Sequence, residues 1–202
     1  MSARQHVNTE LTAKQRLTLF HGTDITAEKA LLLPESDLSF DLLMKHGVRA
    51  VSIATAGLRP LMLKTLGVVN SNQLRRLGFD ALHLVDPTWC QEATAAYGAK
   101  DVVEVFLQTP SDAVALAGSE APSTLGVGMQ RLLEVCAGAP AEALAVLQQV
   151  SLESPLEGVT VVTLLDTGLR APQLKQMGLG LGAVRAMQNL SSYDMAKLGF
   201  TL

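Results

Sequence analysis

Aromatic residues are scarce in this sequence, with five Phe, two Tyr and one Trp among 202 residues. Few side chains are therefore present that could stack on exposed nucleic-acid bases. The two cysteines, Cys90 and Cys136, match no disulfide framework or metal-binding motif, which suits a reducing compartment. No apolar run approaches about 18 residues, and residues 1–19 combine four charged side chains with no apolar stretch. We therefore expect no membrane span and no secretory signal, and an intracellular protein, either cytoplasmic or cytoskeletal.

Charged side chains are also few, at 17% against 48% hydrophobic residues, and the mean hydropathy is +0.26. Such a chain is too apolar to remain disordered, so it must fold or assemble. Its charge is segmented: the net charge is −2 over residues 1–41, +6 over 42–78, −10 over 79–167 and +3 over 168–202. Residues 42–78 contain no acid at all. This pattern indicates either segments that attract one another or a surface for a charged partner.

A short repeat occurs twice in the chain. Its unit is an apolar anchor residue, three further positions, a glycine and a second apolar residue. The anchors stand at positions 43, 53, 63 and 74 in one array and at 164, 174, 184 and 195 in the other, so both arrays have the same spacing. Gln188 replaces the glycine once, and segments 51–68 and 162–179 are identical at seven of eighteen positions. The units are Leu43…Gly47-Val48, Ile53…Gly57-Leu58, Leu63…Gly67-Val68, Leu74…Gly78-Phe79, Leu164…Gly168-Leu169, Leu174…Gly178-Leu179, Val184…Gln188 and Met195…Gly199-Phe200.

This unit is typical of a helix that ends in a Schellman motif. A glycine just past the helix adopts a left-handed conformation, and the apolar residues on either side of the turn pack together. Each unit then predicts one helix of about six to eight residues. Helix starts are indicated at Ser39, at Asn70 and Ser71, at Asp80, and at Ser191 and Ser192, with Pro60 and Pro172 near first turns. Such short helices are unstable alone and must stack on neighbours.

The fold class expected is therefore all-α: a solenoid-like stack of short helices with two helices, or about 21 residues, per layer. We divide the chain into an N-terminal helical segment (1–41), a first array (42–79), an acidic middle (80–160) and a second array (161–202), together one continuous domain. In the N-terminal segment we expect helices at 9–20 and 24–33 with a stop at Gly22.

The acidic middle follows the repeat more loosely. Units are expected to end at Gly98, Gly118 and Gly138, with starts at Asp101 and at Ser111 or Asp112. Longer amphipathic helices are expected at 129–136 and 141–150, and the β-branched run 159–165 is expected to be helical because it lies in the repeat register. Trp89 is expected to cap a layer of the core.

The units Leu63-Lys-Thr-Leu-Gly-Val, Leu74-Arg-Arg-Leu-Gly-Phe, Leu174-Lys-Gln-Met-Gly-Leu and Met195-Ala-Lys-Leu-Gly-Phe resemble the decapeptide L-K-x-x-G-F helical repeats found in proteins of unicellular eukaryotes. The resemblance covers about half the chain, and it implies a scaffold. A more distant similarity is to the helical repeats of mitochondrial transcription terminators, which also carry a leucine–glycine–aromatic turn, with a longer period and a stronger basic character.

No motif in the sequence predicts catalytic, cofactor-binding or metal-ligating residues. The run Gly178-Leu-Gly-Leu-Gly182 lacks the spacing of a phosphate-binding loop, so turn glycines are the better interpretation. His83, Asp86 and Cys90 would have to converge in a pocket for an enzyme, and no accompanying motif supports that. We expect no enzyme activity and no cofactor.

Basic residues are the candidate binding residues. Lys64, Arg75, Lys175 and Arg185 follow the anchor in the last helical turn, where the helix dipole favours cations. Since every unit has the same orientation, we expect them to line one face and to bind a polyanion: an acidic protein surface, such as a tubulin wall, or nucleic acid. A protein partner in a larger assembly is favoured, and nucleic acid is the alternative. This basic set comprises Lys45, Arg49, Arg59, Lys64, Arg75, Arg76, Arg170, Lys175 and Arg185.

Overall fold

The computed structural model describes residues 10–150, 156, 158–185, 187 and 190–200. Across these residues the chain is all-helical, with sixteen α-helices, two 3₁₀ helices and no strand. The longest helix in the described ranges has 11 residues, about 16 Å, and none there is long and apolar enough to cross a bilayer. The elements are α1 (Ala13–Leu19), α2 (Ala27–Leu32), η1 (Glu35–Asp37), α3 (Phe40–Lys45), α4 (Ala50–Thr55), α5 (Pro60–Thr65), α6 (Ser71–Arg76), η2 (Ala81–Val85), α7 (Pro87–Tyr97), α8 (Ala99–Phe106), α9 (Pro110–Ala117), α10 (Ala121–Leu125), α11 (Met129–Val135), α12 (Pro140–Gln149), α13 (Val161–Asp166), α14 (Ala171–Gln176), α15 (Leu181–Arg185) and α16 (Ser192–Leu198).

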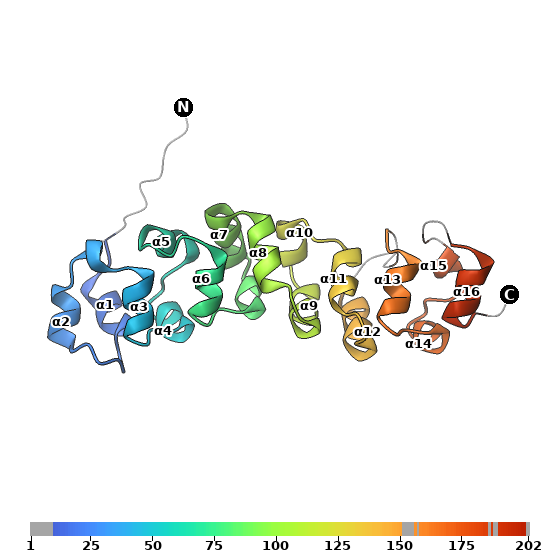
Figure 1. Cartoon of the computed structure of the whole chain (residues 1–202), viewed down its shortest axis with the longest axis horizontal. Helices are drawn as coiled ribbons and strands as arrows, with labels where there is room; N and C mark the ends of the chain where they lie inside the picture. Colours follow the sequence, from blue (N-terminus) through green and yellow to red (C-terminus); the bar gives the residue numbers. More distant parts are fainter. Residues whose placement is uncertain (1–9, 151–155, 157, 186, 188–189, 201–202) are drawn as a thin grey trace, which may run out of the picture.

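The helices follow one another in chain order along an elongated body, with α2 at one end and α15 and α16 at the other (Figure 1). Buried apolar side chains run through the whole length of this body as one connected core. The repeat anchors form part of it: Leu43, Leu63, Leu74, Leu164 and Leu174 are all fully buried. Burying such a leucine stabilises the fold by about 1.5–3 kcal/mol relative to leaving it exposed.

The expected Schellman endings are confirmed in both arrays. After α5, the Val68 amide donates to the Leu63 carbonyl at 3.0 Å and the Gly67 amide to the Lys64 carbonyl at 3.2 Å. The same pair of bonds closes the helices that end before Gly47, Gly57, Gly78, Gly178 and Gly199. These glycines have φ between +70° and +95°, a region that an L side chain rarely adopts.

One turn of the second array closes differently. Gly168 has a φ of +86°, as expected, but the Leu169 amide donates to the Thr167 hydroxyl at 3.3 Å instead of to the anchor carbonyl. The Thr167 hydroxyl thus replaces the Leu164 carbonyl as the acceptor of one of the two Schellman hydrogen bonds. In the remaining unit, the anchor Val184 is fully buried, and Gln188 lies outside the described residues.

The expected helix starts are also confirmed where the structure describes them. The side chains of Ser39, Asn70 and Ser191 accept hydrogen bonds from backbone amides of the first helical turn. Pro60 and Pro172 lie in the first turns of α5 and α14. Asp80 caps an element as expected, but η2 is a 3₁₀ helix.

Helix boundaries in the N-terminal segment and the middle differ from those expected. Helices α1 and α2 begin several residues later than predicted, because the caps are Thr12 and Thr26; Thr9 lies outside the described residues. Helix α9 begins earlier, because Thr109 is its cap and Asp112 accepts a hydrogen bond from the Thr109 amide at 3.0 Å. Helix α8 likewise starts before Asp101. The helices expected at 129–136, 141–150 and 159–165 are present within one or two residues.

The three middle glycines behave differently from one another. Gly98 ends α7 with φ +89°, but its ψ of 139° lies outside the left-handed helical region, so this turn is not the array turn. Gly118 follows α9, yet its φ is −87°, so this turn is not a left-handed one. Gly138 has φ +71° but lies beyond the end of α11, after Cys136 and Ala137. Gly126, which was not expected to end a unit, closes α10 with the array bond pair: its amide donates to the Ser123 carbonyl at 3.2 Å, and the Val127 amide donates to the Pro122 carbonyl at 2.7 Å. The middle is therefore helical and repeats the array turn irregularly.

A Cβ on Gly78, which follows α6, would lie 3.9 Å from Ala50 at the start of α4, and one on Gly199, which follows α16, would lie 3.8 Å from Ala171 at the start of α14. The Ala50 amide also donates to the Leu77 carbonyl at 2.8 Å. These contacts join helices two elements apart, whereas α13 packs on α16, three elements apart. The layer of two helices therefore stays a prediction.

An aromatic cluster joins the first array to the middle. Trp89 is buried, as expected of a core residue, with its ring centroid 5.1 Å from Phe79 and 6.4 Å from Phe106. His83 lies at the edge of the same cluster, 4.9 Å from Phe79. Rings at these separations add about 0.5–1.5 kcal/mol per pair beyond area burial.

Candidate interaction surface

The basic set occupies two kinds of position at helix ends. Lys45, Lys64 and Lys175 lie in last turns, as do Arg75, Arg76 and Arg185, where a cation interacts favourably with the helix dipole. The remaining three, Arg49, Arg59 and Arg170, are the N-cap residues of α4, α5 and α14.

The N-cap arginines were not predicted. An arginine side chain cannot accept a hydrogen bond from the helix, and the guanidinium groups turn back instead: Arg49 Nη1 donates to the Val48 carbonyl at 3.1 Å, and Arg170 Nη1 to the Leu169 carbonyl at 2.8 Å. Each of these carbonyls belongs to the apolar residue that follows the turn glycine. The signal was present in the sequence as the recurring triplet glycine–apolar residue–arginine at 47–49, 57–59 and 168–170.

Three residues of the basic set connect the first array to the acidic middle. Arg59 lies 3.5 Å from the Glu92 carboxylate, and Arg75 lies 3.9 Å from that of Asp112. Lys64 donates through Nζ to the Ala96 carbonyl. Opposite charges of neighbouring segments therefore meet within one chain, which is one of the two interpretations that the charge pattern left open.

Several of these cations also lie over aromatic rings of other elements. Arg76 is 4.9 Å from the centre of the Phe40 ring, Arg75 is 5.9 Å from Phe106 and Lys175 is 5.5 Å from Phe200. Such contacts contribute about 0.5–1 kcal/mol at exposed sites. Part of the basic set thus covers the core of its own chain, in addition to any role toward a partner.

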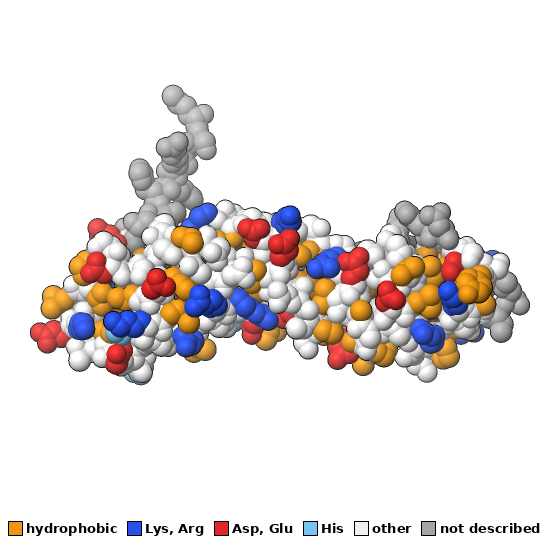
Figure 2. All heavy atoms as spheres, in the orientation of Figure 1, with side chains coloured by type: hydrophobic (Ala, Val, Ile, Leu, Met, Phe, Trp, Pro, Cys, Tyr) orange, Lys and Arg blue, Asp and Glu red, His pale blue; other side chains and the backbone are white. Residues whose placement is uncertain are grey.

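Six members of the basic set form no ion pair with an acid of the described residues: Lys45, Arg49, Arg76, Arg170, Lys175 and Arg185. All six are exposed. On the face shown in Figure 2, Lys and Arg side chains gather over α3, α4 and α6, whereas acidic and basic side chains alternate over the middle. The alignment of the two arrays along one face, expected from the sequence, stays a prediction.

Exposed apolar side chains recur at the second position of a helix. Val51 is 78% exposed, Leu82 66%, Val162 62% and Tyr193 68%. The interval along the chain from Val51 to Leu82 equals that from Val162 to Tyr193, and Val51 aligns with Val162 when the two arrays are superposed in sequence. The two arrays therefore present a matched pair of apolar side chains to solvent.

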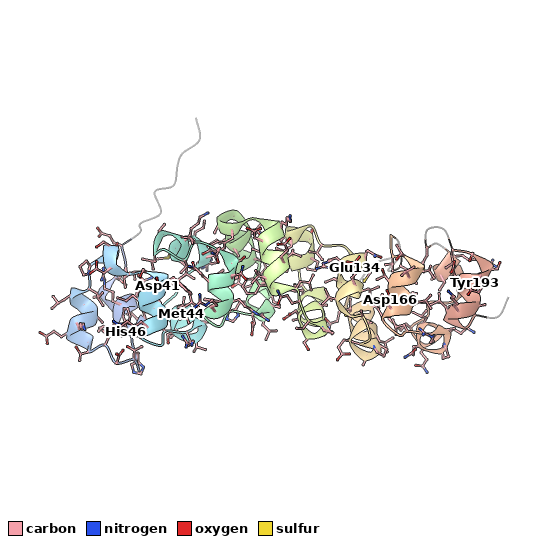
Figure 3. All side chains as sticks on the ribbon, viewed as in Figure 1. Asp41, Met44, His46, Glu134, Asp166 and Tyr193 are labelled. Atoms are coloured by element: carbon pink, nitrogen blue, oxygen red, sulfur yellow. The ribbon has the colours of Figure 1, made fainter. Side chains whose placement is uncertain are left out.

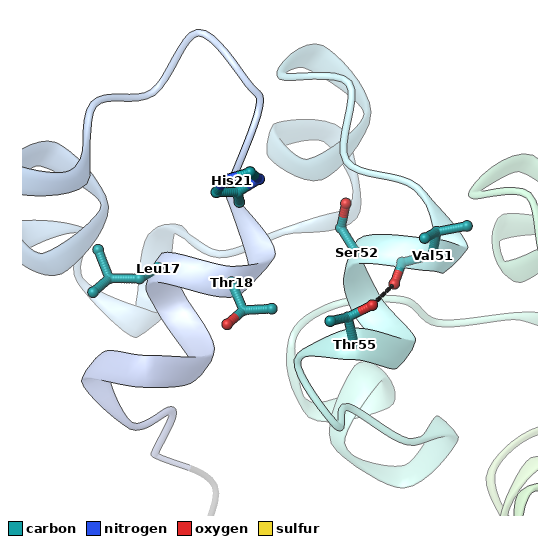
Figure 4. Close-up of a pocket in the computed structure, with 6 residues that line it drawn as sticks. All are labelled: Leu17, Thr18, His21, Val51, Ser52 and Thr55. Carbon is teal, nitrogen blue, oxygen red and sulfur yellow. Dashed lines mark hydrogen bonds between the residues drawn. The ribbon is translucent and has the colours of Figure 1, made fainter.

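A groove lies between α1 and α4, beside Val51 (Figure 4). It has a volume of about 380 Å³ and is lined by Leu17, Thr18, His21, Val51, Ser52 and Thr55. The Thr55 hydroxyl donates to the Val51 carbonyl at 2.7 Å, so it is already satisfied within α4. Without an acid or a lysine in its lining, the groove suits an apolar side chain of a partner better than a charged one.

The residues weighed for catalysis serve structural roles in this fold. The Asp86 carboxylate caps α7 by accepting from the amides of Thr88 at 2.8 Å and Trp89 at 3.1 Å. Cys90 is buried, and burial raises the pKa of its thiol, which disfavours the reactive thiolate. His83 interacts with Asp80, at 2.8 Å between Nδ1 and Oδ1, rather than with Asp86.

In the part of the chain that is described, no group of three or more His, Cys, Asp or Glu side chains is placed to hold a metal ion.

Comparisons with protein-family models, curated proteins and solved structures find no match to this chain.

Proposed function

We propose that this protein is a non-catalytic helical-repeat scaffold, a solenoid of short helices whose flank binds other proteins within a larger intracellular assembly. The observation that carries the proposal is the matched exposure of Val51 and Val162, at 78% and 62%, at equivalent positions of the two arrays. Large apolar side chains that stay in water at repeated positions are typical of a surface that a partner covers.

The continuous core supports the same proposal. Each short helix depends on its neighbours for burial, so the chain acts as an extended rigid support and not as a shell around a pocket. The resemblance to decapeptide repeat proteins agrees with a scaffold. A cytoskeletal assembly, with an acidic wall that would meet Lys45, Arg49 and Arg76, is the partner class that this surface fits best.

Affinity capture from the host cell tests the proposal. The double variant Val51→Asp and Val162→Asp adds two carboxylates at positions that the core does not use, so we expect it to fold and to lose the proteins that co-purify with the wild-type chain. Ala141→Asp is the matched control, because Ala141 is an exposed residue at the second position of α12. Equal recovery of every partner by the double variant would contradict the proposal.

A nucleic-acid-binding solenoid is the second candidate. The acid-free stretch 42–78, with Lys45, Arg49 and Arg76 exposed and without ion pairs in the described structure, is the observation that favours it. Binding of a labelled duplex and a labelled single strand would fall steeply with salt, because counterions are released from phosphates. Lack of binding to both at low salt removes this candidate.

A further inference from the structure

The two ends of the elongated body are formed by different elements. Helix α2 lies at one end and α16 at the other, and Tyr193 is seen at the α16 end (Figures 1 and 3). We call residues 24–37 the N-end face and the helices α15 and α16 the C-end face.

Both end faces expose large apolar side chains. On the N-end face, Leu31 is 45% and Leu32 75% exposed, and on the C-end face Tyr193 is 68% exposed. Hydrophobic side chains are visible at both ends in Figure 2. The outermost repeats of a helical stack ordinarily need a polar outer surface to stay soluble and single. Among the described residues, each of these two ends instead keeps a large apolar side chain in water.

The N-end face is acidic. It carries Asp24, Glu28, Glu35 and Asp37 against the single base Lys29. Asp24 is bonded to His46 at 2.6 Å and Glu35 to Arg16 at 3.3 Å, and within the described residues Glu28 and Asp37 have no basic side chain in ion-pair contact.

The C-end face is basic. It carries Arg185 and Lys197 against Asp194, and α14 beside it contributes Lys175. The Asp194 carboxylate is occupied by the cap of α16, where it accepts from the Ser191 amide at 3.1 Å. Lys197 Nζ lies 4.4 Å from the centre of the Tyr193 ring, so a cation accompanies the exposed aromatic side chain.

We propose that the C-end face of one copy of this protein binds the N-end face of the next copy. The contact would bury Leu32 against Tyr193 and bring Lys197 and Arg185 toward Glu28 and Asp37. Two identical ends would instead place like charges together, so head-to-head pairing is disfavoured. A head-to-tail contact between unlike faces does not close on itself, and it produces open linear chains. This inference rests on the proposed scaffold function and deepens it, since a subunit that polymerises would present its flank repeatedly.

Sedimentation velocity and light scattering of the full chain over a concentration series test the proposal. We expect the weight-average mass to rise above 21.4 kDa with concentration at low salt and to return toward it at high salt. The variants Leu32→Glu and Tyr193→Glu each place a carboxylate on one end face only, and each is expected to stay monomeric. Val162→Glu, on the flank, is the matched control and should associate as the wild type does.

Mixing the two end variants is the decisive arm. The Leu32→Glu chain keeps a normal C-end face and the Tyr193→Glu chain a normal N-end face, so their equimolar mixture should form dimers and stop there. A wild-type chain that stays monomeric at every concentration and salt overturns the proposal. Association of either end variant alone, or absence of dimers in the mixture, also overturns it, because head-to-tail contact requires both faces.

The self-association experiment can fail without affecting the test of the scaffold function. Capture of other proteins depends on Val51 and Val162, which lie outside both end faces, and the self-association assay contains purified protein alone. A chain that captures partners yet never self-associates would refute only the head-to-tail contact.

Discussion

The first array (42–79) and the second (161–202) are built from the same unit, and at matched positions of the described residues they fold in the same way. Leu63 and Leu174 are both fully buried, and Gly67 and Gly178 have φ of +81° and +79°. The bonds that close the two turns, from Val68 to Leu63 and from Leu179 to Leu174, measure 3.0 and 2.9 Å. The same local sequence pattern therefore produces the same helix ending at both places.

The surroundings of the two arrays differ. In the first array, Arg59 and Arg75 pair with acids of the middle, and Lys64 donates to the Ala96 carbonyl. In the second array, Arg170 donates to the adjacent Leu169 carbonyl, and Arg185 has no acid partner among the described residues. The same type of side chain thus joins two segments in one array and stays available at the surface in the other.

The largest expected effect tests the shared core. Leu63→Ala and Leu174→Ala should each lower the free energy of unfolding by about 2–5 kcal/mol, because each removes a fully buried side chain. Chemical denaturation measures the loss, and Leu→Met at the same positions is the volume-conserving control. A loss confined to one array would break the equivalence of the two.

The second-largest loss of stability is expected from substitutions at the glycine turns. Gly67→Ala and Gly178→Ala should each cost about 1–2 kcal/mol, since alanine must adopt a left-handed conformation. The new Cβ would lie 3.7 Å from Ser39 at position 67, an ordinary contact, and in open space at 178. Gly182→Ala is the control, and its effect should have the opposite sign. Gly182 lies within α15 and has no positive φ, so the substitution should stabilise the fold by about 0.5–1 kcal/mol. A much larger loss at 67 than at 178 in chemical denaturation would show that the neighbouring turn cannot adapt.

The different surroundings of Arg75 and Arg185 predict a smaller difference in the free energy of unfolding. Arg75→Gln should destabilise the fold by about 0.5–1 kcal/mol, because Arg75 lies 3.9 Å from the Asp112 carboxylate. Arg185→Gln should cost less, because Arg185 has no acid partner among the described residues. Thermal melts at low salt and at about 1 M salt separate the effects, since screening should reduce the loss for Arg75. Equal losses for both variants would indicate that the helix dipole, and not the ion pair, dominates.

The smallest expected effect concerns the caps of α6 and α16. Asn70 and Gln73 form a cap that does not titrate, whereas the hydrogen bond from Ser191 lowers the pKa of Asp194 below its ordinary value of 3.8. Because the pKa of Asp194 is lower in the folded chain than in the unfolded one, the ionised carboxylate stabilises α16 at any pH above the ordinary pKa of aspartate. This stabilisation is lost as the pH falls through the folded-state pKa of Asp194. Acid should therefore fray α16 before α6.

Carboxyl titration by NMR measures this effect. Ser191→Ala should return the pKa of Asp194 toward its ordinary value, while the chemical shifts of α6 stay unchanged. An Asp194 that titrates identically in both proteins would contradict the capping interpretation.

Much of the fold could be predicted because its information is local. The Gly–apolar turn specifies a helix end within a few residues, so the endings at Gly47, Gly67 and Gly178 follow from the sequence. The start of α9 was missed because Asp112 is not the N-cap but the third helical residue of a capping box whose N-cap is Thr109. The number of helices in one layer does not follow from the turn alone, because the angle between successive short helices depends on side-chain packing.

The candidate surface was predictable only in part. The positions of Lys64 and Arg75 in last turns could be read from the repeat, but their contacts with Ala96 and Asp112 join residues that lie far apart in the chain. The exposure of Val51 and Val162 could not be foreseen, since an apolar residue at the second helical position is buried or exposed according to what packs beside it.

What the sequence alone determined is the all-helical character of the chain, the endings of its repeated helices and their buried anchors, because these depend on backbone conformation and hydrophobic pattern over a few neighbouring residues. Only the tertiary structure decided which cations are used internally, which apolar side chains remain in water and which helices form the two ends. Those outcomes depend on how helices that are not neighbours in the sequence meet in space, and that geometry is the sum of many small packing contacts that no single segment encodes.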